Sequence, residues 1–124
     1  MDLAFFLGGT PQSLAPFVSG ALDWHPAGAV FAGAGVTTTG ALFSYQANWA
    51  APGRWGVEVL TRARRFIFRP MEQLHVQAIG SVAVNRVPLD DALDTRYKPG
   101  LHRQVAAFLA PGPAHPNLLA LAEH

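Results

Sequence analysis

The central part of the chain alternates apolar and polar residues with the period of two that is typical of β-strands. In residues 41–49, one strand face would carry four apolar side chains, Phe43, Tyr45, Ala47 and Trp49. Similar runs occupy residues 13–23, 29–37, 55–62, 65–69, 74–79 and 82–87. The pattern predicts an α+β fold with an open, mainly antiparallel β-sheet of about six strands. We expect helices on one face of that sheet and the other face to be free, as antiparallel sheets allow.

Turn-forming residues connect two pairs of these runs. Thr38-Thr39-Gly40 separates residues 29–37 from residues 41–49, and Gly80-Ser81 separates residues 74–79 from residues 82–87. Short connections containing glycine favour hairpins, in which the two strands are antiparallel. We therefore expect a hairpin at each of the two positions.

Helical patterns are confined to the two ends of the chain. Residues 2–7 predict a short helix that ends at Gly8-Gly9. Leu101, Val105, Phe108 and Leu109 have helical spacing after Pro99, which suits a first helical turn. Asn117 can cap a last helix over residues 118–124. The first and last helices resemble pieces of longer helices, and we expect a single domain over residues 1–124.

The composition suggests that part of the surface is covered. Of the 124 residues, 14% are charged, against about a quarter in an average soluble domain. We expect another domain or subunit to cover the remaining surface. The net charge of +1 favours neither nucleic acid nor a membrane. There is no cysteine, signal peptide or membrane-spanning run, which fits a cytoplasmic location.

Gly33-Ala34-Gly35 is the only stretch that resembles a phosphate-binding loop. A dinucleotide fingerprint needs a third glycine and a helix that follows directly. Here the next residues are Val36 and three threonines, which favour a strand and a turn. We predict that these glycines allow the close approach of a neighbouring side chain or backbone. The sequence therefore contains no motif that would bind NAD or NADP.

Charged residues form two groups, each of which has a structural and a functional interpretation. Five arginines, with Trp49, Trp55 and Phe66 nearby, could form a platform for single-stranded nucleic acid: Arg54, Arg62, Arg64, Arg65 and Arg69. The favoured interpretation is a solvated hairpin tip or an intersubunit salt bridge. Glu58 can also pair with some of these arginines across strands. Asp90, Asp91 and Asp94 are interpreted as a solvated connection. The histidines lack the spacing of a zinc site.

Two short segments are the candidates for binding a small polar ligand. Asn48-Trp49 and Arg54-Trp55 flank a break between strands, and each pair offers hydrogen-bond donors beside an aromatic face. Asp23-Trp24-His25-Pro26 brings an acid, an aromatic ring and a base to a strand end. The candidate substrate-binding residues are Asn48, Trp49, Arg54 and Trp55, followed by Asp23 and His25. A simple turn at Asp23–His25, and tryptophans packed in a core or interface, remain the alternatives.

Four stretches of the sequence match a family pattern. They are residues 2–8 (DLAFFLG), 40–49 (GALFSYQANW), 51–61 (APGRWGVEVLT) and 98–105 (KPGLHRQV). Together they resemble the carboxy-terminal domain of the glucose–fructose oxidoreductase and inositol dehydrogenase family (Gfo/Idh/MocA). The resemblance covers nearly the whole chain, and its middle section is the most specific.

The resemblance implies a substrate-side and oligomerisation domain. In that family, an amino-terminal Rossmann domain holds NAD or NADP, and the open sheet commonly packs against another subunit. Hydride passes between the cofactor and a hydroxyl of a sugar, an inositol or a nucleotide-linked sugar. The family's Glu-Lys-Pro motif is missing here, and the chain begins just after the place of the catalytic histidine. We therefore expect this chain to bind no cofactor and to be inactive without its Rossmann domain.

A second class of function fits the same features. A stand-alone, non-catalytic module that dimerises and binds a ligand would also have an open sheet and no cofactor motif. It predicts a stable dimer in which the open face is buried. Both interpretations predict a homo-oligomer and a small, sugar-like ligand.

Overall fold

The computed structural model describes residues 2–110, which divide between Val87 and Pro88 into two compact units. The first unit contains helix α1 (Asp2–Gly8) and the described strands, which form two sheets. The second contains helices α2 (Ala92–Arg96) and α3 (Leu101–Leu109). The predicted α+β class with open, antiparallel sheets is confirmed. The strands are divided between two sheets, however, where the sequence predicted one.

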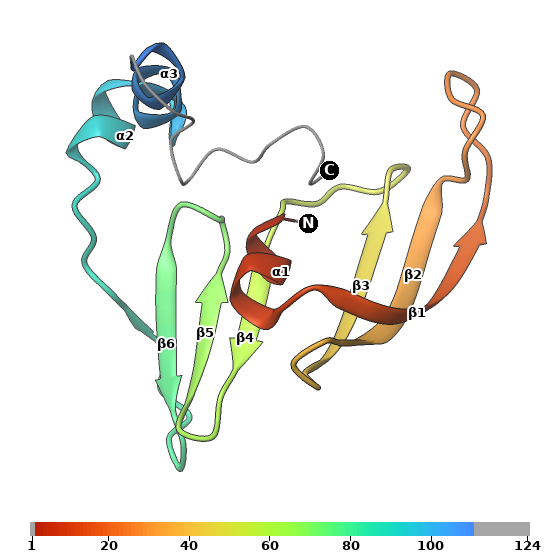
Figure 1. Ribbon diagram of the computed structural model, residues 1–124, viewed down its shortest axis with the longest axis horizontal. Helices are drawn as coiled ribbons and strands as arrows, with labels where there is room; N and C mark the ends of the chain where they lie inside the picture. The colour runs from red at the N-terminus through yellow and green to blue at the C-terminus, as the bar shows by residue number, and fades with distance from the viewer. Residues whose placement is uncertain (1, 111–124) are drawn as a thin grey trace. The chain divides into compact units, whose positions relative to one another are not determined.

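The first sheet has three antiparallel strands in the order β1 (Pro11–Ser19), β2 (Val30–Thr37) and β3 (Leu42–Asn48) (Figure 1). The predicted hairpin at Thr38–Gly40 is confirmed, since β2 pairs with β3 and Gly40 has a φ of 83°. Thr37 is buried at this turn, and its Oγ1 accepts a hydrogen bond from the amide of Ala41 at 3.1 Å. The turn is therefore stabilised by a side chain as well as by glycine.

The second sheet has four antiparallel strands, β4 (Val57–Leu60), β5 (Arg64–Phe68), β6 (Leu74–Ala78) and β7 (Asn85–Arg86). Figure 1 shows β4, β5 and β6 side by side. The predicted second hairpin is confirmed in its pairing, because His75 lies opposite Arg86. Its second strand is only two residues long. Local hydrogen bonds occupy the connection instead: the side-chain amide of Gln77 donates to the carbonyl oxygen of Ser81 at 2.8 Å.

The two faces of the three-stranded sheet differ. Residues directly opposite each other in neighbouring strands share a face. One face carries the rings of Phe43 and Tyr45, and Phe5 of α1 packs edge-on against Phe43 with ring centroids 5.3 Å apart. The opposite face, here called the open face, consists of Ser13, Ala15, Phe17, Ser19, Val30, Ala32, Ala34, Val36, Leu42, Ser44, Gln46 and Asn48. All but Ala32 and Val36 are exposed.

The glycines of β2 have the packing role predicted for them. Gly33 lies opposite Tyr45, and a Cβ atom there would be 2.6 Å from the tyrosine hydroxyl. Gly35 lies opposite Phe43, and a Cβ atom there would be 2.7 Å from Cζ of that ring. Both distances are too short for a side chain. The aromatic residues of β3 therefore lie across the glycines of β2.

Little apolar surface is buried within the described part of the chain. Among residues 2–110, Ala29 is the one buried apolar residue. Large apolar side chains remain exposed, with Phe17 at 71% and Leu42 at 86% on the open face. Apolar burial is the main favourable contribution to folding. The strands therefore form a surface that another polypeptide can stabilise by covering it.

The second unit is helical, partly as predicted. Helix α3 contains the expected apolar residues, and Gly100, with a φ of 74°, precedes it. Helix α2 was not predicted; its Asp94 accepts a hydrogen bond from the amide of Gly100 at 2.9 Å instead of lying in a solvated connection. The helix expected at 118–124, with Asn117, lies outside the described residues. None of the described helices combines the length and apolarity needed to cross a membrane.

Candidate functional site

A cavity of about 370 Å³ lies beside the break between β3 and β4. It is a depression at the surface, because all the residues that line it are exposed. Its lining comes from β3, from the break itself and from the residue after β5: Gln46, Pro52, Gly53, Arg54, Trp55, Gly56 and Arg69. Two residues predicted to bind substrate, Arg54 and Trp55, are thus brought into one site.

The break is shaped by a turn at its start. Oδ1 of Asn48 accepts a hydrogen bond from the amide of Ala50 at 2.9 Å. Asn48 therefore shapes the backbone that leads to the cavity, and it is absent from the cavity lining. Asn48 remains a predicted substrate residue, with one side-chain oxygen already engaged by the turn.

The two predicted tryptophans lie together. The rings of Trp49 and Trp55 meet edge to face, with centroids 6.3 Å apart and an interplanar angle of 77°. Trp49 is 56% exposed and Trp55 is 67% exposed. They are thus not packed in a core of the first unit, which leaves a ligand surface or an interface. An exposed aromatic pair of this kind offers an apolar wall with large contact area.

Gln46 and Arg69 line the cavity but were not among the predicted substrate-binding residues. Arg69 is the charged one of the two. It follows β5, next to Phe68, which lies opposite Val57 at the start of β4. A Cβ atom at Gly56 would lie 2.9 Å from Nε of Arg69 and 3.1 Å from the carbonyl oxygen of Phe68. The missing side chain at position 56 therefore leaves the space that Arg69 occupies. Gly56, directly after Arg54 and Trp55, was the sequence feature that could have indicated a close neighbour at this position.

The cavity carries positive charge with no matching carboxylate in its lining. Arg54 and Arg69 contribute two guanidinium groups, and the remaining lining residues are uncharged. Within residues 2–110 one carboxylate–arginine ion pair forms, between Glu58 and Arg65. The arrangement thus has two cationic, fork-shaped donors beside an aromatic ring, and it suits a ligand with both polar and apolar parts.

Asp23 and His25 lie in a turn that is separate from the cavity. The amide of Ala27 donates to Nδ1 of His25 at 3.1 Å, and the Trp24 and His25 rings meet edge to face, 5.5 Å apart. The alternative of a simple turn fits these contacts. Neither Asp23 nor His25 lines the cavity, and their binding role stays a prediction.

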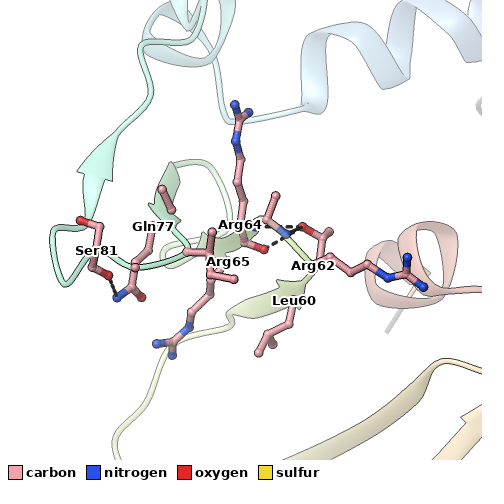
Figure 2. Close-up of a pocket in the computed structure, with 11 residues that line it drawn as sticks. Leu60, Arg62, Arg64, Arg65, Gln77 and Ser81 are labelled. Atoms are coloured by element: carbon pink, nitrogen blue, oxygen red, sulfur yellow. Dashed lines mark hydrogen bonds between the residues drawn. The ribbon is translucent and has the colours of Figure 1, made fainter.

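A second, smaller cavity of about 260 Å³ lies at the tip of the β4–β5 hairpin. Figure 2 shows the side chains of Arg62, Arg64 and Arg65 pointing in three different directions, so they do not converge on one ligand. Nε of Arg65 donates to Glu58 at 3.0 Å, the cross-strand pair expected from the sequence. These three arginines are exposed, as a solvated hairpin tip requires. The alternative of an intersubunit salt bridge stays a prediction.

The described histidines and carboxylates do not gather at either cavity. Among residues 2–110, no three histidine, aspartate or glutamate side chains lie close enough together to hold a metal ion. Comparison of the chain with protein-family models, with curated proteins and with solved structures found no match. The function is therefore argued from the residues of the cavity and of the open face.

Proposed function

We propose that this chain is the carboxy-terminal, substrate-side and oligomerisation domain of a cytoplasmic NAD(P)-dependent oxidoreductase. The substrate class would be a sugar, a polyol or a nucleotide-linked sugar, oxidised or reduced at a hydroxyl carbon. The support consists of the resemblance to the Gfo/Idh/MocA family in residues 2–105, the α+β fold and the two surfaces described above.

The observation that carries the oligomerisation part of the proposal is the charge-free open face. Strands β1, β2 and β3 contain no aspartate, glutamate, lysine, arginine or histidine. Exposed strands normally use charge to prevent pairing with other chains. Here the face combines small residues with Phe17 and Leu42, and a second copy of the chain can cover it without bringing like charges together. A homo-oligomer through this face is the arrangement that the proposal requires.

The cofactor would be held by a separate Rossmann domain. Gly33 and Gly35 lie in the middle of β2, each against an aromatic ring of β3, and no helix begins after them. Gly33 and Gly35 therefore do not fit a dinucleotide phosphate, which needs backbone amides at a helix start. Hydride transfer is accordingly assigned to the complete enzyme and to no residue of this chain.

The cavity supports the substrate-side role. Trp55 gives an apolar wall, and Gln46, Arg54 and Arg69 give hydrogen-bond donors around it. Ligand sites commonly combine apolar walls with a few polar groups that fix orientation. A sugar has both kinds of surface, because its ring carbons are apolar while its hydroxyls are polar.

A titration with reduced nicotinamide cofactors tests the assignment of the domain. NADH and NADPH are each mixed with the chain, and the nicotinamide fluorescence is followed. We expect no binding, because the phosphate-binding loop belongs to the other domain. Saturable binding at micromolar concentration would overturn the assignment, since it would place the cofactor site within these residues.

The stand-alone dimerising module remains the second candidate, and the open face supports it equally. The two candidates differ in what is translated together with this chain. The dehydrogenase assignment predicts an upstream segment in the same reading frame that contains a Gly-x-Gly-x-x-Gly fingerprint. Sequencing the transcript decides between them: a stop codon directly upstream in that frame would favour the module.

A further inference from the structure

The cavity beside the break between β3 and β4 has a more specific chemistry than the proposed function requires. A neutral sugar needs hydrogen-bond donors and acceptors in similar number. This lining supplies two arginines, which donate only, and a single glutamine that can also accept through its side chain. The excess of charged donors indicates a ligand that brings negative charge.

Both arginines are available to such a ligand. Glu58 is the acidic residue nearest to Arg54 along the described chain. Its carboxylate is already paired with Arg65. Arg54 and Arg69 form no ion pair with any described residue, and both side chains are exposed. A guanidinium group keeps its charge at any physiological pH and matches the two oxygens of a carboxylate or phosphate.

The backbone beside the cavity leaves room for the Arg69 side chain. Gly56 leaves the space that the Arg69 side chain occupies, since a Cβ atom there would approach its Nε to 2.9 Å. Gly53 lines the same cavity, but a Cβ atom there would have no atom within 4 Å. The requirement for glycine is thus specific to the position that faces the arginine.

We propose that this cavity binds the anionic group of a sugar ligand, with Arg54 and Arg69 on the anion and Trp55 against the sugar ring. The ligand would be a sugar acid, through its carboxylate, or a phosphorylated sugar, through its phosphate. This inference rests on the proposed function for the sugar part of the ligand. It narrows the substrate class to anionic sugars.

The arginines at the hairpin tip provide a contrast within the same chain. Arg62 and Arg64 are equally charged and exposed, but their side chains diverge and no tryptophan lines their cavity (Figure 2). If positive charge alone attracted the ligand, the hairpin tip would bind as well as the proposed site. Arg62→Gln is therefore a matched control for Arg54→Gln and Arg69→Gln.

The test is calorimetric titration of the full chain with four probes at constant ionic strength: glucose, glucuronate, glucose 6-phosphate and inorganic phosphate. We expect glucuronate or glucose 6-phosphate to bind at least about tenfold more tightly than glucose, the value of one charge-assisted hydrogen bond. Preference for glucuronate identifies a carboxylate as the source of the anion, and preference for glucose 6-phosphate identifies a phosphate.

Variants assign the binding to the cavity. Arg54→Gln and Arg69→Gln should each weaken the preferred anionic probe by about tenfold or more, and Arg62→Gln should leave it unchanged. Gly56→Ala should weaken binding without removing any charge. Gly8→Ala should leave binding unchanged, because Gly8 lies outside the cavity and a Cβ atom there would meet nothing within 4 Å. Far-ultraviolet circular dichroism checks that each variant keeps its secondary structure.

Several results would overturn the inference. Equal affinity for glucose, glucuronate and glucose 6-phosphate would remove the anion requirement and would leave the proposed sugar-binding role intact. Equal affinity for inorganic phosphate and glucose 6-phosphate would show a plain anion site without a sugar. The proposed anion site would also be rejected if no probe bound. It would be rejected too if Arg62→Gln lowered the affinity for the anionic probe as much as Arg54→Gln and Arg69→Gln do. The cofactor titration judges the domain assignment independently of these outcomes.

Discussion

Gly35 is the residue at which the packing of the three-stranded sheet is tightest. A Cβ atom at this position would overlap the carbonyl oxygen of Ser13 in β1 and would lie 2.7 Å from Cζ of Phe43 in β3. Both neighbours belong to strands on either side of β2, so neither can move without disturbing the hydrogen-bonded register. The glycine therefore sets how closely the three strands and their aromatic side chains pack.

The first prediction concerns this glycine. Gly35→Ala should lower the free energy of unfolding by about 1–3 kcal/mol, the usual cost of overpacking. The matched control is Gly53→Ala, where a Cβ atom meets nothing within 4 Å, and its effect should stay within about 0.5 kcal/mol. Urea denaturation at fixed protein concentration measures both. A stability loss as large for Gly53→Ala as for Gly35→Ala would show that the contact at Gly35 is unimportant.

At the same scale, the sequence predicted some site residues and missed another. Arg54 and Trp55 could be expected, because they are adjacent and follow the break between two predicted strands. Arg69 could not, since it reaches the cavity only through the pairing of Phe68 with Val57. Long-range neighbours depend on strand register, which a single sequence specifies weakly when several apolar strands can pair.

At the scale of helices and strands, the sequence predicted the two faces of a strand better than it predicted which strands share a sheet. The alternation in residues 41–49 predicted which side chains of β3 would be half-buried and which exposed, as the structure shows. The division into two sheets was not predicted, because the Ala51–Gly56 break and the continuation of a sheet look alike in sequence. The length of β7 was not predicted either, since turn hydrogen bonds around Ser81 compete with strand pairing.

The element-scale prediction concerns the stability of individual strands. Amides of β2 should exchange more slowly with deuterium than those of β7, because β2 is paired on both sides and β7 has two residues and one neighbour. Hydrogen exchange followed by mass spectrometry on peptides covering Val30–Thr37 and Asn85–Arg86 measures the difference. Equal protection of the two strands would contradict the strand assignment at β7.

For the whole molecule, the near-absence of a buried apolar core in the described residues is the feature with the widest consequence. Low charge content predicted that some surface would be covered, and the open face is the surface that matches this expectation. A chain that completes its core by association gains stability by mass action, so its stability is tied to its concentration. If the chain oligomerises through the open face as proposed, its oligomerisation and its folding are the same property.

Sedimentation velocity over a series of protein concentrations tests the proposed oligomerisation through the open face most directly. We predict that the chain sediments as a dimer or larger oligomer, and that Phe17→Glu, which puts charge on the open face, shifts it to the monomer. Leu60→Glu is the control, because Leu60 is 74% exposed, similar to Phe17 at 71%, but belongs to the other sheet; it should leave the oligomer intact. A wild-type chain that stays monomeric at every concentration would contradict the proposed oligomerisation through the open face.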